Sequence, residues 1–133
     1  MNAPVILRIL LVASGGAVGS VLRYLVSGLG SRWGNGIFPW GTMLVNLAGS
    51  FLIGLAWGLL GREDTPPQTR LFLFIGIFGG FTTFSTFTFE SFNLFRDGNI
   101  KMAVGNLLIS NIGGIICVFA GILVSGIILQ LKK

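Results

Sequence analysis

Four stretches of this sequence are apolar over a length that matches the thickness of a lipid bilayer. The hydrocarbon core of a bilayer is about 30 Å thick, so a spanning helix needs roughly 20 mostly apolar residues. The connecting segments carry glycine, proline and charged residues, which are typical of turns. We therefore predict an all-α membrane protein that forms a single membrane domain, residues 1–133. Its four transmembrane helices are expected over residues 6–30, 41–60, 71–95 and 102–131.

The small number of charged side chains excludes a water-soluble domain. Nine of the 133 residues are Lys or Arg and four are Asp or Glu, whereas a soluble domain has about a quarter of its residues charged. The chain has no histidine and one cysteine, Cys117, so it offers neither a disulfide framework nor a Cys/His metal site. Its basic residues are scattered rather than gathered in a stripe, which argues against a nucleic-acid partner and favours anionic lipid headgroups as neighbours.

The distribution of basic residues gives the predicted helices only a weak preferred orientation. With four spans, one side of the membrane would carry Arg8, Arg62, Arg70, Lys132 and Lys133, and the other side would carry Arg32, Arg96 and Lys101. Two interpretations stay open: one fixed orientation that the count does not reveal, or insertion in both directions, which would permit an antiparallel dimer. The first apolar run is expected to be a retained helix rather than a signal peptide, because Arg23 follows it and the small-residue spacing continues.

Small residues recur four positions apart, at Gly15 and Gly19, Gly54 and Gly58, and Gly76 and Gly80. Such spacing lets membrane helices approach closely. It is explained equally well by packing within one subunit or between subunits. A bundle of four helices has little interior of its own, so a pathway for a polar solute is expected to form between subunits.

The third apolar segment contains the sequence GGFTTFSTFTFE, residues 79–90. Glycine and β-branched residues are poor helix formers, so Gly79, Gly80, Thr82 and Thr83 predict a break in this helix. Broken helices at membrane depth are tolerated where the freed backbone is buried or lines a cavity, and their carbonyl groups often coordinate a cation such as sodium. The hydroxyls of this stretch are expected to cap the freed backbone groups. They belong to Thr82, Thr83, Ser85, Thr86 and Thr88.

Two ionisable side chains lie inside predicted spans, Arg23 and Glu90. Such a residue costs about 2.5–3.5 kcal/mol at the centre of a membrane helix, which makes it a functional candidate. Arg23 could reach the interface, or it could face a water-filled vestibule and concentrate anions. Glu90 could reach the interface, accept hydrogen bonds from neighbouring helices, or carry protons.

Two rows of polar residues, spaced four positions apart, mark the second and fourth segments. A single buried amide usually joins two helices, whereas two such rows in a small protein favour a polar-lined path. The rows are Thr42, Asn46 and Ser50, and Asn106, Ser110 and Gly114, with Asn111 beside the second.

Phenylalanine is concentrated in the third segment, which holds nine of the twelve. Four of them recur at every third residue, so they wind around the helix and cannot all face lipid. The edge of an aromatic ring is electropositive and could meet an anion. A lipid-facing or core cluster of rings is the alternative explanation.

These residues together resemble a known family. The stretch 79–90 resembles the signature of the Fluc (CrcB) fluoride channels, GG-x-[ST]-TFSTF-x-x-E. GGAVGSVLRY in the first segment, GTMLVNLAGSFLIG in the second, and the row from Asn106 to Gly114 in the fourth also match, so the resemblance covers essentially the whole chain. The chain departs at two positions, with Asn106 where some members have tyrosine and Gly114 where some have serine.

The resemblance implies a multi-pass protein of the bacterial inner (cytoplasmic) membrane that is not an enzyme. It implies an antiparallel, dual-topology homodimer with two pores, through which fluoride leaves the cell passively and which gives fluoride resistance. A structural sodium ion is expected at the dimer centre, held by backbone carbonyls of Gly79 and Thr82.

The resemblance also assigns roles to individual side chains. Phe84 and Phe87 match the pore phenylalanines whose ring edges contact fluoride, and Arg23 matches a vestibule arginine. Asn46 and Ser110 match polar groups of the pore. Thr42 and Asn106 are also expected to belong to the fluoride pore. The other polar candidates are Thr83, Ser85, Thr86 and Glu90.

Two other functions stay open from the residues alone. One is a small dual-topology, proton-coupled exporter that uses Glu90. The other is a membrane subunit that transports nothing and only assembles with partners. An exporter of that kind is expected to carry its carboxylate in the first helix, where this chain has Arg23. A passive subunit would not need a helix break with hydroxyls at membrane depth.

Overall fold

The computed structural model describes residues 4–30, 32–33, 36–61 and 65–131. Within these ranges the chain is helical, and four helices are long and apolar enough to cross a membrane. The first is α1, Val5–Gly30, and the second is α2, Trp40–Leu60. Both lie within one residue of the predicted spans. Arg62, Lys132 and Lys133, which entered the count of basic residues, lie outside the described residues.

The third and fourth spans are each built from several helical pieces. The third, Pro67–Arg96, runs through α3, a π-helical segment η1, the short α4, and α5. The fourth, Ile100–Leu131, contains a π-helical segment η2 between two α-helices. The pieces of the third are α3 (Pro67–Arg70), η1 (Leu71–Phe78), α4 (Gly79–Phe81) and α5 (Phe84–Arg96). Those of the fourth are α6 (Ile100–Leu108), η2 (Ile109–Gly113) and α7 (Gly114–Leu131).

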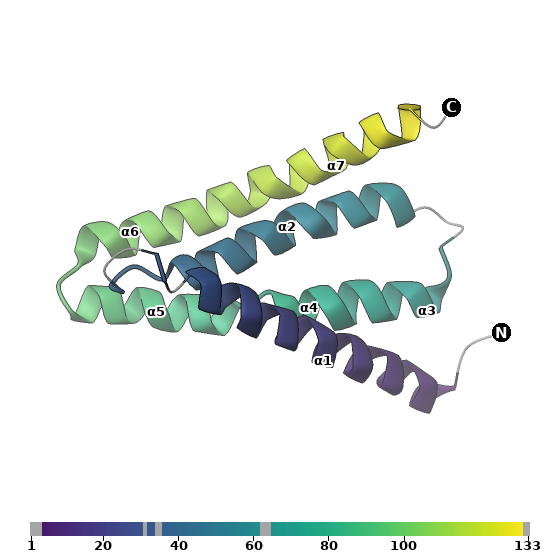
Figure 1. Ribbon diagram of the computed structural model, residues 1–133, viewed down its shortest axis with the longest axis horizontal. Coiled ribbons are helices and arrows are strands. Elements are labelled where there is room, and N and C mark those ends of the chain that lie inside the picture. The colour runs from purple at the N-terminus through teal and green to yellow at the C-terminus, as the bar shows by residue number, and fades with distance from the viewer. Residues whose placement is uncertain (1–3, 31, 34–35, 62–64, 132–133) are drawn as a thin grey trace.

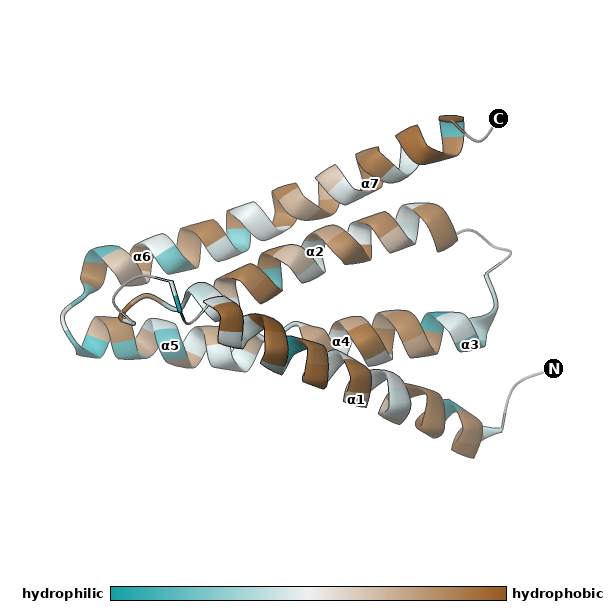
Figure 2. Cartoon of the chain, viewed as in Figure 1, coloured by the Kyte–Doolittle hydropathy of each residue, from teal (hydrophilic) through white to brown (hydrophobic). Residues whose placement is uncertain are grey.

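The four spans form an up-and-down bundle in which α1 crosses in front of the third span in this view (Figure 1). The start of α1, the end of α2, α3 and the end of α7 lie at one end of the bundle, and the turn from α5 to α6 lies at the other. Apolar residues cover most of every span (Figure 2), and large side chains such as Leu10, Ile75 and Leu123 are exposed. These outward faces match a lipid environment rather than water.

The helix break is present, but it lies beyond the glycine pair. Gly79 is in the right-handed helical region, whereas Thr82 (φ −80°, ψ 156°) and Thr83 (φ −147°, ψ 115°) are extended. Gly80 is needed for a different reason: a Cβ there would lie 2.6 Å from the carbonyl oxygen of Gly16 on α1. The predicted break is therefore confirmed at Thr82 and Thr83, whereas its extension to Gly79 and Gly80 was wrong, because both glycines stay helical and Gly80 serves helix packing.

The recurring glycines pack helices within the subunit. Gly15 and Gly76 bring α1 against η1, since a Cβ on Gly76 would lie 2.8 Å from the Cα of Gly15. On the other side of the bundle, a Cβ on Gly54 or Gly121 would collide with backbone of α7 or α2, respectively. Two pairs of closely packed spans result, α1 with the third span and α2 with the fourth.

The turn between α5 and α6 decides which faces of the third and fourth spans meet. Gly98 has a positive φ of 79°, and the backbone N–H of Asn99 donates to the carbonyl of Leu94. This closed turn folds α6 back along α5. Ser91 and Asn106 are thereby buried between the two helices, where they hydrogen-bond to each other.

Candidate functional site

Three cavities lie along α2 and the third span, the first two against α1 and the last against the fourth span. We call them the outer, arginine and phenylalanine cavities, with volumes of about 720, 320 and 330 Å³. The outer and arginine cavities share Tyr24, Ser27, Thr42 and Thr86, and the arginine and phenylalanine cavities share Thr83. The shared residues join the three cavities into a series, and all five carry hydroxyl groups.

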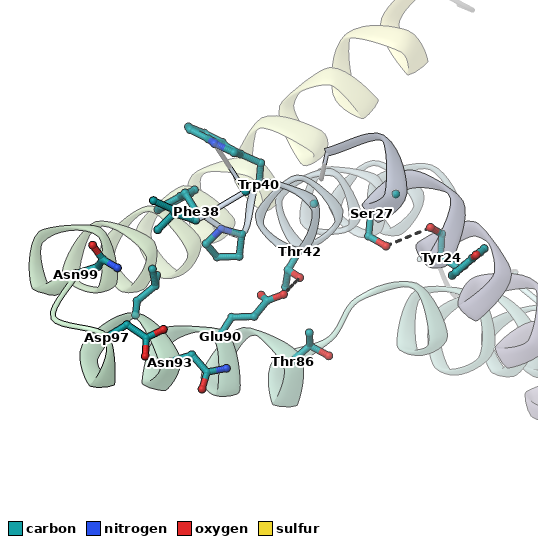
Figure 3. Close-up of a pocket in the computed structure, with 16 residues that line it drawn as sticks. Tyr24, Ser27, Phe38, Trp40, Thr42, Thr86, Glu90, Asn93, Asp97 and Asn99 are labelled. Atoms are coloured by element: carbon teal, nitrogen blue, oxygen red, sulfur yellow. Dashed lines mark hydrogen bonds between the residues drawn. The ribbon is translucent and has the colours of Figure 1, made fainter. Parts of the chain in front are cut away.

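The outer cavity lies between the beginning of α2 and the second half of α5 (Figure 3). Glu90 of α5 and Thr42 of α2 point toward each other in it, and the Thr42 hydroxyl donates to Glu90 Oε1 at 2.8 Å. Glu90 Oε2 and Asn93 Oδ1 are buried without a hydrogen-bond partner among the described residues. The carboxylate therefore joins two helices with one oxygen and has acceptor capacity left on the other.

The arginine cavity is lined by one positively charged side chain and by several hydroxyl groups. Arg23 of α1 lines it together with Ser20, Thr42, Thr83 and Thr86. An arginine side chain offers several N–H donors and stays charged, so this cavity suits a small anion. Arg23 shares this cavity with Thr83 of the helix break, and its vestibule role stays a prediction.

Asn46 satisfies the backbone at the helix break. Its Oδ1 accepts from the backbone N–H of Thr83 at 2.8 Å, and its Nδ2 donates to the Thr83 carbonyl at 3.0 Å. In an uninterrupted helix that N–H would bond to the carbonyl of Gly79, which is four residues earlier. Asn46 thus holds the extended conformation of Thr83, and one Nδ2 hydrogen remains for other partners.

The threonine hydroxyls cap the broken helix, as the sequence predicts. The Thr83 hydroxyl accepts from the backbone N–H of Thr86 at 3.4 Å and lies 3.0 Å from the Thr86 hydroxyl. The Thr82 hydroxyl donates to the carbonyl of Phe78 at 2.9 Å. These contacts begin α5 at Phe84 and direct its N-terminal end toward the cavities.

The phenylalanine cavity has aromatic rings on α5 opposite polar groups on the fourth span. Phe84 and Phe87 line it with ring centroids 5.8 Å apart and an interplanar angle of 52°. Phe87 is 4% exposed, whereas Phe84 is 74% exposed in the single subunit. Ser110 and Asn111, at the π-helical segment η2, line the same cavity.

Asn106 lies behind the phenylalanine cavity rather than in it. It is 1% exposed and does not line any of the three cavities. Its Nδ2 donates to the hydroxyl of Ser91, and the hydroxyl of Ser110 donates to its Oδ1. Sequence reasoning missed Ser91, although its position one turn after Phe87 was a signal for it.

The remaining predicted residues lie apart from the cavities or at the break. Ser85 is exposed and lines none of the three cavities. Gly79 has open space around it, and Thr82 lines the phenylalanine cavity. The described residues contain no group of three or more His, Cys, Asp or Glu that could bind a metal ion. At the break, the Thr83 N–H bonds to Asn46 instead of the Gly79 carbonyl, which leaves that oxygen without its helical partner.

Comparison with known proteins agrees with these features. Residues 10–122 match the model of the family described as CrcB-like protein, Camphor Resistance (CrcB). A protein of Parabacteroides distasonis is 45% identical over 127 residues, which cover 96% of this chain and 99% of the relative. A protein of Agrobacterium fabrum is 46% identical over 117 residues, covering 87% and 94%. Both relatives are named fluoride-specific ion channel FluC.

Proposed function

We propose that this chain, which belongs to the CrcB family, is a channel that conducts fluoride passively across a membrane. The observation that carries the proposal is the series of three cavities, which leads from Glu90 past Arg23 and the helix break to Phe84 and Phe87. The relatives named fluoride-specific ion channel identify fluoride as the anion.

The chemistry of the cavities suits a small, strongly hydrated anion. Fluoride gives up bound water on entering a narrow path, and the loss is tolerable only if donors replace that water. Hydroxyls of Thr42, Thr83, Thr86 and Ser110 line the series at intervals, and Arg23 adds a positive charge. Aromatic ring edges at the far end offer weaker electropositive contacts and exclude larger anions by their bulk.

The functional unit that we propose is an antiparallel, dual-topology homodimer with two pores. The phenylalanine cavity is open in the single subunit, and Phe84 projects from it with most of its surface exposed. A second copy packed against this face would close the cavity and give Phe84 a partner surface. The weak charge asymmetry of the chain is compatible with insertion in both directions.

A sodium ion at the centre of this dimer is part of the proposal. The backbone carbonyls of Gly79 and Thr82 would hold it, one pair from each copy. Bound there, the ion would neutralise the exposed carbonyl dipoles of the two broken helices. In this arrangement Asn46 keeps the Thr83 N–H away from the Gly79 carbonyl, which leaves that oxygen available.

We place the protein in the bacterial cytoplasmic membrane as a multi-pass protein, where outward fluoride flux down its electrochemical gradient would give fluoride resistance. The decisive experiment uses purified protein in liposomes loaded with potassium fluoride. A passive channel moves charge, so efflux should begin only when valinomycin lets potassium follow. Chloride-loaded liposomes should release much less anion.

The same experiment tests the rings. Phe84→Ile and Phe87→Ile keep bulk and apolarity but remove the aromatic edge, so flux should fall steeply while gel filtration still shows a dimer. Phe119→Ile is a matched control, because Phe119 is exposed on α7 and lines none of the three cavities. If both ring variants conduct like the parent, the phenylalanines serve only packing.

The alternative is a proton-coupled exporter that uses Glu90, whose Oε2 is buried without a partner. Movement of a proton outward together with each fluoride would balance charge without potassium. Efflux that proceeds without valinomycin and follows an imposed pH gradient would support the exporter and refute the channel.

A further inference from the structure

The hydroxyls of this protein follow two patterns of hydrogen bonding. Serine and threonine on a helix commonly donate back to a carbonyl three or four residues earlier. Among the described residues six do so, namely Ser14, Ser27, Thr82, Thr88, Ser91 and Ser125. Three hydroxyls donate to another side chain instead, those of Thr42, Thr83 and Ser110, and all three line cavities of the series.

Ser110 is redirected by a buried chain of hydrogen bonds that ends at the backbone of α5. The Ser91 hydroxyl donates to the Phe87 carbonyl at 2.8 Å, and Asn106 Nδ2 donates to the Ser91 hydroxyl at 2.9 Å. The Ser110 hydroxyl donates to Asn106 Oδ1 at 3.3 Å. Asn106 is 1% and Ser91 3% exposed, so water does not compete for these bonds.

The Phe87 carbonyl, at the end of this series of hydrogen bonds, determines which group donates in each of the three bonds. A carbonyl only accepts, so the Ser91 proton must point to Phe87 and the Ser91 oxygen must accept from Asn106. The amide of Asn106 therefore turns Nδ2 toward Ser91 and Oδ1 toward Ser110. Ser110 is left as the donor of the last bond, which is also the longest of the three.

We propose that Asn106 is a positioning residue for Ser110. From behind the phenylalanine cavity, Asn106 keeps the Ser110 hydroxyl away from the backbone of the fourth span. The hydroxyl is held by one long hydrogen bond to Asn106, which an arriving anion can replace. Through Ser91 it also ties that hydroxyl to the turn of α5 that carries Phe87. The inference rests on the proposed fluoride conduction and assigns a role to a residue that does not line the path.

Without Asn106, the Ser110 hydroxyl is expected to bond to a carbonyl of its own helix, as the six others do. A backbone carbonyl is fixed in the helix and would keep the proton from the anion. Fluoride passing Phe87 would then lack a donor on the opposite wall. The consequence is slower conduction without a loss of folding.

The test is a double-mutant cycle on fluoride efflux from liposomes, with Asn106→Leu, Ser110→Ala and the double variant. Leucine has a similar volume and removes both polar ends of the amide together, which limits the cost to folding. Each single variant should conduct about tenfold more slowly than the parent, and the double variant no more slowly than the slower single, because the groups share one network. A residue that only joins α5 to α6 would lower the rate by the same factor with or without Ser110.

Ser91 supplies a second, independent test. Ser91→Ala removes the acceptor that orients Asn106 and should slow efflux, whereas Ser91→Thr retains a hydroxyl and should conduct within about twofold of the parent. Ser125→Ala is the matched control, because Ser125 is a buried serine of α7 that donates only to the carbonyl of Ile122. Its efflux should equal that of the parent.

The outcomes separate the inference from the proposed function. If the parent conducts fluoride but the cycle is additive, or Asn106→Leu conducts normally, Asn106 does not position Ser110 and the channel assignment stands. If Asn106→Leu fails to form a dimer, equal rates for Ser91→Ala and the parent overturn the inference. A parent that conducts no fluoride refutes the proposed function, and the inference with it.

Discussion

Replacing Asn46 by leucine should destabilise the protein at its helix break. The amide of Asn46 makes two hydrogen bonds to the backbone of Thr83, at 2.8 and 3.0 Å, from a position 37 residues earlier in the chain. Leucine fills a similar volume, so the change removes the hydrogen bonds without leaving a large cavity. The effect therefore measures what holds Thr83 in its extended conformation.

The magnitude follows from the two backbone groups that lose a partner. The Thr83 N–H has no carbonyl to return to while the chain stays extended, and an unsatisfied buried donor costs about 1–3 kcal/mol. The Thr83 carbonyl loses its hydrogen bond from Asn46, which is worth about 0.5–1.5 kcal/mol. Its loss costs less than that of the N–H because Thr83 precedes α5 and its carbonyl also faces that helix. Together they predict a loss of about 2–4 kcal/mol in the free energy of unfolding.

The assay is equilibrium unfolding in mixed detergent micelles, followed by circular dichroism, with Ser50→Ala as the control. Ser50 lies one turn after Asn46 on α2 and lines the same cavity, but no hydrogen bond is found for its side chain among the described residues. The control should change stability by less than about 0.5 kcal/mol. If Asn46→Leu is no less stable than Ser50→Ala, Asn46 does not hold the break, and the geometry of Thr83 needs another explanation.

Three further predictions concern packing, the outer cavity and topology. Gly121→Ala should lower the free energy of unfolding by about 1–3 kcal/mol, because a Cβ there collides with the backbone of α2. Gly126 has open space around it, so Gly126→Ala should leave that free energy unchanged or raise it by up to about 1 kcal/mol. Equal effects of the two variants would refute close packing of α7 on α2 at Gly121. Thr42→Val should cost about 1–3 kcal/mol by leaving Glu90 Oε1 without its donor, and Thr42→Ser should restore stability if the hydroxyl is what matters. A single cysteine in the 61–70 loop should react with impermeant reagents from both faces of a membrane, and reaction from one face alone would exclude dual topology.

The four spans could be read from the sequence because bilayer thickness acts on each segment separately. The prediction of 41–60 for the second span differs by one residue from Trp40–Leu60. The hydroxyl caps at the break were also predictable, since Thr83 and Thr86 are close in sequence and their contact is local. Dimerisation, dual topology and the sodium site stay predictions, as do the roles of the candidate residues in conduction.

The position of the break was decided by contacts between distant parts of the chain. Glycine and β-branched residues are poor helix formers, and local propensity therefore spread the predicted break over Gly79, Gly80, Thr82 and Thr83. In the folded chain Gly80 stays helical because its missing side chain lets α1 approach, and Thr83 leaves the helix because Asn46 supplies both of its backbone partners. Both α1 and Asn46 are far from residues 79–83 in sequence, so no local pattern could reveal these contacts.

Asn106 likewise has one property that the local sequence predicts and another that tertiary contacts decide. Its spacing of four residues from Ser110 correctly put the two side chains on one helical face, because helical periodicity is a local property. Whether that face met the pathway or another helix depended on the turn at Gly98, which folds α6 back onto α5 and buries Asn106 against Ser91. The sequence alone determined where this chain spans the membrane and which residues share a face; tertiary packing decided which polar groups line the cavities and which hold them in place, since burial depends on neighbours that only the fold brings together.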